Sequence, residues 1–279
     1  MSVEGKTILV TGATSGIGQV AARELAKMGA KVVALGRSQQ KLDQLRGMQT
    51  LRCDLSSLAD VRRAAAEFRQ RFGKLHVLLN NAGGINRARE LTADGYERTF
   101  AVNHLAYFAL TNELLDVLKA SAPARIVNVA SEASRVPVGV DVDDLQLERH
   151  WSKMRSYGLS KRMNLLFTFE LARRLEGTGV TVNALHPGTV YSGFGSGTGL
   201  IRLFYEVARP FMLTSEQGAQ TAIWLCSSPE VEGVTGRYFC KKREIRAVGQ
   251  AYDRDLQHKL WDESARLVTR ATSPAPAPS

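Results

Sequence analysis

Thr11-Gly-Ala-Thr-Ser-Gly-Ile-Gly18 is a glycine-rich turn that lies between a predicted strand and a predicted helix. The β-branched run at residues 7–10 precedes it, and a helical pattern follows whose apolar face holds Ile17, Ala21, Leu25 and Met28. Such a turn lets the backbone approach a pyrophosphate, which the free N–H groups of the helix then bind. Because the spacing is GxxxGxG rather than the commoner GxGxxG, a tight turn without a ligand is the alternative.

The same alternation of short apolar runs and helical patterns continues along the chain. Further strands are predicted at residues 31–35, 51–54, 75–79, 125–129 and 180–185, and further helices at 39–45, 59–72, 100–119 and 157–176. Strands that alternate with long helices predict an α/β fold with one Rossmann-type, doubly wound, mostly parallel sheet flanked by helices. We expect one domain over residues 1–272 and a disordered Pro/Ala tail at 273–279.

Composition excludes some classes of protein and leaves one number to explain. The 279 residues are 44% hydrophobic and 23% charged, which argues against extensive disorder and fibrous repeats. The formal net charge is +10, which is compatible with nucleic acid, an anionic membrane surface or a phosphorylated small molecule. The basic residues are scattered and no recognition motif appears, so we expect no nucleic-acid partner.

The cysteines and the apolar stretches indicate a cytoplasmic protein. Cys53, Cys226 and Cys240 have no CxxC or Cys/His spacing, so we expect reduced thiols and no metal site. No secretory signal precedes the first strand, and the longest uncharged stretch, residues 177–201, contains Pro187 and many Gly, Ser and Thr residues. We therefore expect no integral membrane segment.

The end of the second predicted strand reads Leu35-Gly36-Arg37-Ser38 and carries no carboxylate. An acidic residue there would hold the 2′-hydroxyl of the adenosine ribose in NAD, whereas an arginine accommodates the 2′-phosphate of NADP. Lys41, Arg46 and Arg52 follow, so the sequence favours NADP(H), and the alternative is an Arg37 that only lies on a solvated helix start. Asp54 could accept a bond from the adenine amino group or be an ordinary carboxylate at a strand end.

Tyr157 and Lys161 are spaced i, i+4, which places them on one face of a helix. A phenol has an ordinary pKa of about 10, and a neighbouring ammonium favours its phenolate, so the pair is a candidate acid/base. Ser131 follows the strand at 125–129 and could bind a substrate carbonyl or hydroxyl, or else serve as a turn or cap residue.

These motifs occur in order along an α/β chain: the turn ending at Gly18, Asn80-Asn81-Ala82-Gly83, Asn103, Ser131, Tyr157 with Lys161, and Pro187-Gly188. The chain thereby resembles the short-chain dehydrogenase/reductase family from residue 6 to about 268. The resemblance implies a catalytic tetrad of Asn103, Ser131, Tyr157 and Lys161. Tyr157 would be the general acid/base, and Ser131 would polarise the reacting oxygen. Lys161 would bind the nicotinamide ribose and lower the Tyr157 pKa, and Asn103 would hold the water of a proton relay.

The resemblance also implies a set of cofactor-binding residues along the carboxyl ends of the strands. These are Gly12, Thr14, Ser15, Gly16, Ile17, Gly18, Arg37, Asp54, Leu55, Asn81, Ala82, Gly83, Tyr157, Lys161, Pro187, Gly188, Val190 and Ser192. Ala130 and Gly84 replace residues that are often seen in the family's motifs, which could alter the pocket.

Several segments look like the retinol-dehydrogenase-like branch of that family. They are the long gap between Ser131 and Tyr157 with Asp144-Leu145-Gln146 inside it, Asn103-His-Leu-Ala-Tyr-Phe108, Phe167-Thr-Phe-Glu-Leu-Ala172 and Gln217-Gly-Ala-Gln-Thr221. The branch implies an NADP-preferring oxidoreductase of retinal-like or other apolar aldehydes and ketones. The N-terminal membrane anchor of several relatives is not expected here.

Residues 191–213 would form an apolar substrate lid in this family, with an amphipathic helix packed on its own core as the alternative. Relatives often dimerise through the helices that hold Asn103 and Tyr157, yet some do not, so the oligomeric state stays open between a monomer and a homodimer. A nucleotide-sensing binding protein with this fold and little turnover is the alternative function, and the intact tetrad argues against it.

Overall fold

The computed structural model describes residues 2–188 and 213–270. Most of the expected lid and the expected tail therefore lie outside the described residues. One eight-stranded sheet has the order β3-β2-β1-β4-β5-β6-β7-β8 and is parallel except for β8. Its strands are β1 (Thr7–Thr11), β2 (Lys31–Gly36), β3 (Gln49–Arg52), β4 (Val77–Asn80), β5 (Ala124–Val129), β6 (Val180–His186), β7 (Arg237–Cys240) and β8 (Arg243–Glu244). The doubly wound, Rossmann-type sheet is confirmed.

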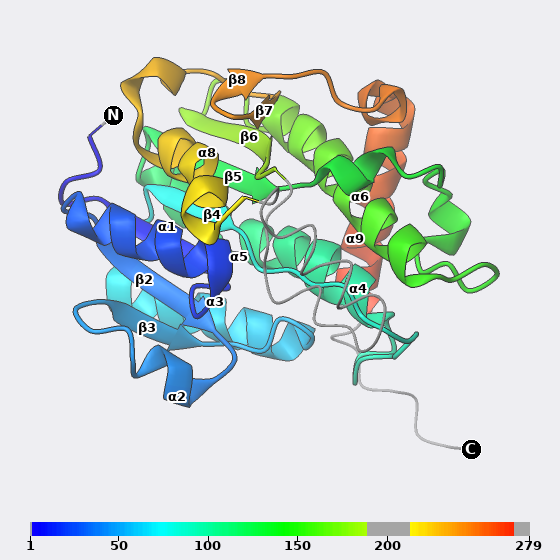
Figure 1. Ribbon diagram of the computed structural model, residues 1–279, viewed down its shortest axis with the longest axis horizontal. Coiled ribbons are helices and arrows are strands. Elements are labelled where there is room, and N and C mark those ends of the chain that lie inside the picture. The colour runs from blue at the N-terminus through cyan, green and yellow to red at the C-terminus, as the bar shows by residue number, and fades with distance from the viewer. Residues whose placement is uncertain (1, 189–212, 271–279) are drawn as a thin grey trace.

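Helices cover both faces of this sheet (Figure 1). They are α1 (Gly16–Lys27), α2 (Gln39–Leu42), α3 (Leu58–Phe72), α4 (Arg98–Phe100), α5 (Ala106–Ala120), α6 (Lys153–Arg174), α8 (Ser215–Ser227) and α9 (Arg254–Arg270). Successive residues of β1 are apolar and point to opposite faces of the sheet, so both faces need a layer of helices. Ile8 and Val10 pack toward α1 and α8, and Leu9 packs toward α3 and α5.

Element ends differ in places from the sequence prediction. Met28 was expected on the apolar face of the first helix, but α1 ends at Lys27 and Met28 is 46% exposed. The helix that carries Tyr157 begins earlier than predicted, at Lys153, because the Ser152 hydroxyl accepts a bond from the Arg155 amide and caps it. β4 begins at Val77 rather than at residue 75.

The hairpin β7–β8 was not predicted from the sequence. Its two-residue loop, Lys241 and Lys242, has φ values of +50° and +60°, as a type I′ turn requires. Glycine and asparagine are the usual residues at such positions, so a sequence with two lysines there does not indicate the turn. The basic run Lys241-Lys242-Arg243 is exposed, and its two lysines form this turn.

The C-terminal helix α9 lies across α5 and α6 (Figure 1). The Trp261 ring is 4.9 Å from that of Phe108 on α5 and 5.9 Å from that of Phe167 on α6. α9 therefore packs on the two helices through which a homodimer was expected, and that homodimer stays a prediction.

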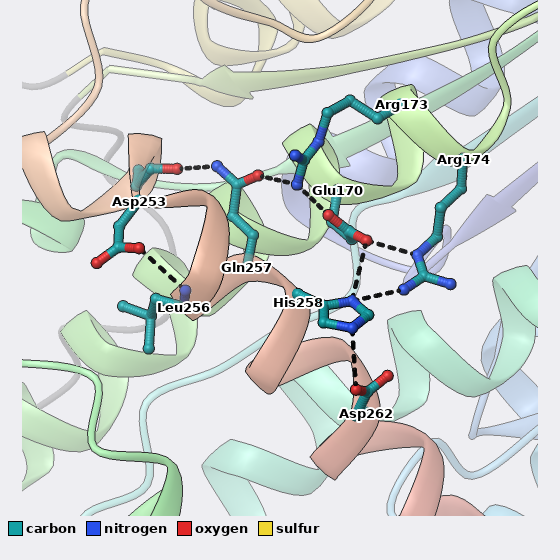
Figure 2. A network of polar contacts seen from close by, with 9 residues as sticks. Glu170, Arg173, Arg174, Asp253, Leu256, Gln257, His258 and Asp262 are labelled. Atoms are coloured by element: carbon teal, nitrogen blue, oxygen red, sulfur yellow. Dashed lines mark hydrogen bonds and ion pairs between the residues drawn. The ribbon is translucent and has the colours of Figure 1, made fainter.

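A polar network fastens α9 at the edge of this contact. Figure 2 shows the buried Glu170 carboxylate between two arginines of α6, Arg173 and Arg174, with Arg174 Nε 2.6 Å from Glu170 Oε1. Gln257 on α9 accepts a 2.7 Å bond from Arg173, and His258 lies 3.1 Å from Arg174.

Among the described residues, no helix is both long enough and apolar enough to span a membrane.

Candidate active site

The glycine-rich turn lies at the carboxyl end of β1 and forms a close-fitting cradle. Gly12 has φ +67°, and a Cβ there would lie 2.9 Å from Ala82 Cα. A Cβ on Gly18 would collide with the Gly12 carbonyl oxygen and the Asn81 amide. The turn therefore needs glycine at both positions.

Thr11, which sequence analysis did not single out as a site residue, locks this cradle to the next strand. Its hydroxyl accepts bonds from the amides of Asn81 at 2.9 Å and Ala82 at 3.0 Å, and donates to the Leu79 carbonyl at 3.3 Å. The Asn81 amide group in turn donates to the Thr11 carbonyl at 2.9 Å. The predicted Asn81-Ala82 contact strip and the glycine turn are thus one connected unit.

The N-terminus of α1 faces the same edge of the sheet. Ser15 is the cap residue, and its side chain makes no bond to its own helix. A Cβ on Gly16 would meet open space, and Gly36 admits the side chain of Thr14, whose methyl would lie 2.7 Å from an added Cβ. Ser15, Gly16 and Ile17 therefore stand where a helix N-terminus can receive an anion.

A cavity of about 370 Å³ lies beyond the end of β2 and is lined by Arg37, Arg52, Asp54, Asp60 and Arg63. Asp60 is engaged by Arg63 at 2.7 Å and by the Asp54 amide at 2.6 Å. Burial works to raise the Asp54 pKa, but bonds from Ser56 and the nearby Arg37 lower it on balance. Asp54 Oδ1 closes a turn with Ser56, while buried Leu55 packs in the core.

Asn103 lies in a π-helical turn, Ala101–Leu105, that connects α4 to α5. Its fully buried side chain accepts from the Gly84 amide at 2.8 Å and donates to the Gly84 carbonyl at 2.9 Å and to the Ser160 hydroxyl at 3.0 Å. Its main-chain carbonyl accepts a 2.9 Å bond from Asn164. π-helical turns of this kind are frequent at functional sites, and this one is bonded to α6 through Ser160 and Asn164.

Ser131, Tyr157 and Lys161 lie close together. Ser131 follows the carboxyl end of β5, and Tyr157 and Lys161 lie in the N-terminal half of α6. Ser131 hydrogen-bonds to the Tyr157 hydroxyl, which lowers the tyrosine pKa, but burial is the larger effect and raises it. Lys161 Nζ is 5.7 Å from the centre of the Tyr157 ring and donates to the Val129 carbonyl at 2.8 Å. The residues that sequence analysis grouped are therefore neighbours in space.

The expected lowering of the Tyr157 pKa by Lys161 is not found. Burial lowers the pKa of Lys161 itself to about 7, which disfavours its charged form. The Tyr157 pKa is raised on balance, and the phenol is protonated at neutral pH.

The remaining predicted contacts lie around this group. A Cβ on Gly83 would lie 3.1 Å from Asn103 Oδ1 and 3.3 Å from Lys161 Nζ, so a larger residue there would press on both side chains. Pro187 and Gly188 follow β6, where the His186 ring accepts bonds from the Glu132 and Gly188 amides. Val190 and Ser192 lie outside the described residues.

Comparison with known proteins places this arrangement in a family. The profile described as short chain dehydrogenase matches residues 6–198. The chain belongs to the short-chain dehydrogenase family. This short-chain dehydrogenase is 43% identical to human retinol dehydrogenase 14, over 95% of the chain and 87% of that protein. It is therefore an oxidoreductase of the retinol-dehydrogenase-like branch, which uses an NAD(P) cofactor.

Two solved structures extend the comparison. An uncharacterized protein from Mycobacterium paratuberculosis matches this short-chain dehydrogenase with a TM-score of 0.78 and 31% identity, covering 96% of this chain and 95% of that one. A short chain dehydrogenase from Burkholderia cenocepacia, in complex with NADP, matches with a TM-score of 0.68 and 26% identity, covering 86% of this chain and 97% of that one.

Proposed function

We propose that this short-chain dehydrogenase transfers a hydride between NADP(H) and the carbonyl or alcohol carbon of an apolar substrate, with Tyr157 as general acid/base. The observation that carries the proposal is the convergence of Ser131, Tyr157 and Lys161 beside the glycine cradle. A reacting oxygen next to Tyr157 would meet two hydroxyl groups and a lysine on one side and the cradle on the other.

The residues present fit a nicotinamide dinucleotide. The backbone at Gly12 and Gly18 leaves no room for a Cβ, and the N-terminus of α1 faces outward beside it. When bound, the dinucleotide supplies or accepts the hydride. Every other requirement, including proton transfer and orientation, falls on side chains of this chain.

The preference for NADP over NAD is supported by the cavity beyond β2. Its carboxylates are engaged, Asp60 with Arg63 and Asp54 with Ser56, whereas within residues 2–188 and 213–270 neither Arg37 nor Arg52 forms an ion pair. Two arginines that form no ion pair with a described residue suit a 2′-phosphate, which guanidinium groups bind with paired, charge-assisted hydrogen bonds.

In the reductive direction, the Tyr157 hydroxyl would give its proton to the substrate carbonyl oxygen while Ser131 donates a hydrogen bond to the same oxygen. The raised Tyr157 pKa suits this direction because the phenol carries the required proton at neutral pH. Lys161, next to Tyr157, would bind the ribose of the nicotinamide and hold the ring in place. An apolar substrate is supported by the names of the relatives and by the composition of residues 191–213.

The test is a steady-state assay of the full chain with retinal, decanal and glyceraldehyde, each with NADPH and with NADH. We expect NADPH oxidation with the two apolar aldehydes and little with glyceraldehyde or with NADH. Tight NADPH binding without turnover across the panel would contradict the proposal and favour a nucleotide-sensing binding protein.

A further inference from the structure

The segment between β5 and α6, which begins at Ser131 and ends at Ser152, rests directly on the helix that carries Tyr157. A Cβ on Gly158 would lie 2.6 Å from the Ala133 carbonyl oxygen and 2.9 Å from the Val136 Cβ. The contact between Gly158 and residues 133–136 therefore lies next to Tyr157 on α6 and close to Ser131 along the chain. Because this segment connects the two, its position decides how they face each other.

Arg162, the residue after Lys161, binds this segment through its main chain. Its side chain is only 6% exposed. Nε donates to the Ser134 carbonyl at 2.9 Å, Nη2 to the Val136 carbonyl at 2.7 Å, and Nη1 to the Val138 carbonyl. No ion pair to Arg162 occurs in the part of the chain that the structure describes, so the buried guanidinium is held by carbonyl oxygens rather than by a carboxylate.

Gln250, in the 3-10 turn Gly249–Tyr252, completes this clamp from the other side. Its Oε1 accepts from Arg162 Nη1 at 3.0 Å and from the Val140 amide at 3.1 Å. Main-chain groups of four alternate residues, 134, 136, 138 and 140, thus bind one arginine–glutamine pair. Leu147, later in the same segment, has a φ of +52°, a costly conformation that persists only where surrounding contacts hold it.

The clamp reaches Ser131 through one short turn. The Ser134 amide donates to the Ser131 carbonyl at 3.0 Å, and the Ser134 carbonyl is the acceptor of Arg162 Nε. Burying a cation without a carboxylate partner costs desolvation free energy. The five donors of the guanidinium can fix several carbonyls at once, which suits a role in conformation.

We propose that Arg162, together with Gln250, is a positioning residue that holds residues 134–140 against α6 and so sets Ser131 opposite Tyr157. The inference rests on the proposed function of Ser131 and Tyr157. It predicts that loosening the clamp harms turnover by misplacing Ser131, without touching the cofactor cradle.

The chain offers a matched control in Arg125, on β5. Arg125 is 5% exposed and also donates to main-chain carbonyls, those of Leu225 at 3.0 Å and Ser228 at 2.8 Å. It lies near the amino end of β5, whereas Ser131 follows the carboxyl end. Arg162→Gln and Arg125→Gln therefore each remove a buried guanidinium that binds main-chain carbonyls, one beside the segment that follows β5 and one near the amino end of β5.

The experiment compares these variants, with Arg162→Lys and Gln250→Ala as milder changes, for kcat/KM with decanal, NADPH affinity and pH profile. In Arg162→Gln we expect kcat/KM to fall by about 10- to 100-fold with NADPH affinity unchanged. The pKa that limits reduction should rise, because Tyr157 loses the bond from Ser131. Arg162→Lys should recover part of the loss. Arg125→Gln should lower the melting temperature without these kinetic effects.

Hydrogen exchange of the peptide spanning residues 133–141 provides a readout that does not depend on turnover. Faster exchange in Arg162→Gln or Gln250→Ala, but not in Arg125→Gln, would support the clamp even if no substrate in the panel is reduced. Unchanged exchange would overturn the clamp. The positioning role would be overturned if exchange is faster in Arg162→Gln but its kcat/KM and pH profile match those of the control Arg125→Gln.

Discussion

Lys161 Nζ lies 5.7 Å from the centre of the Tyr157 ring, and the lysine side chain is buried. Burial lowers the Lys161 pKa from an ordinary 10.5 to about 7. The fold therefore holds an amine in a position where its charged form is unfavourable. Burying this amine lowers the stability of the fold, and a role of Lys161 at the ribose of the cofactor would explain why it is kept.

Replacing this amine should stabilise the protein while it removes activity. The folded state disfavours protonation, so the penalty is complete below pH 7 and declines as the pH rises from 7 toward 10.5. A shift of this size corresponds to several kcal/mol, more than the single bond to Val129 contributes. We expect Lys161→Met to raise the melting temperature by about 3 °C or more at pH 6 and by less at pH 9. A variant that melts below the wild type at pH 6, or a difference independent of pH, would contradict this account.

Arg37 should decide the choice between the two dinucleotides. Removing its guanidinium takes away charge-assisted bonds to a 2′-phosphate, so the Kd for NADPH should rise by about 10- to 100-fold in Arg37→Ser. The Kd for NADH should change little, because NADH lacks that phosphate. Arg243→Ser, at an exposed arginine on β8, is the control for general charge. Equal weakening of both cofactors would argue that Arg37 lies outside the phosphate site.

The cradle at Gly12 can be tested against a glycine with the same backbone geometry. Gly5 and Gly12 both have φ +67°, but an added Cβ meets nothing within 4 Å at Gly5 and lies 2.9 Å from Ala82 Cα at Gly12. Gly5→Ala should cost about 1 to 2 kcal/mol from backbone strain alone. Gly12→Ala should cost more and should also weaken NADPH binding, measured by denaturant unfolding and fluorescence titration. An equal loss of unfolding free energy in the two variants would show that the close approach of Gly12 to Ala82 does not affect stability.

Thr11 should matter through its oxygen rather than through its size. Thr11→Val leaves the Asn81 and Ala82 amides without their acceptor, so we expect the unfolding free energy to fall by about 2 kcal/mol or more. Thr11→Ser keeps that oxygen and should retain most of the stability and the NADPH affinity. If the serine variant is as unstable as the valine variant, packing of the methyl group rather than hydrogen bonding explains the role of Thr11.

Sequence patterns predicted those parts of this fold that depend on local periodicity. The strand at residues 7–10, the turn ending at Gly18 and the i, i+4 pair Tyr157 and Lys161 each have a signature within a few residues. In a parallel sheet these signatures are enough to place the candidate site, because the carboxyl ends of the strands meet at one edge.

Other features depend on partners that no local pattern shows. Arg162 appears as one more polar residue in a helix, since its partners are carbonyl oxygens that every residue carries. Thr11 acts on amides about 70 positions away. The direction of the Tyr157 and Lys161 pKa shifts follows from burial, which is a property of the folded chain and not of the spacing between them.

The most direct test of the account is the rate of NADPH oxidation by Tyr157→Phe with an apolar aldehyde, measured together with NADPH affinity. The variant keeps the ring and loses only the hydroxyl that would carry the proton. We predict that turnover falls by about 100-fold or more while the Kd for NADPH stays near that of the wild type. Turnover equal to that of the wild type would contradict the assignment of Tyr157 as the acid and base of this enzyme.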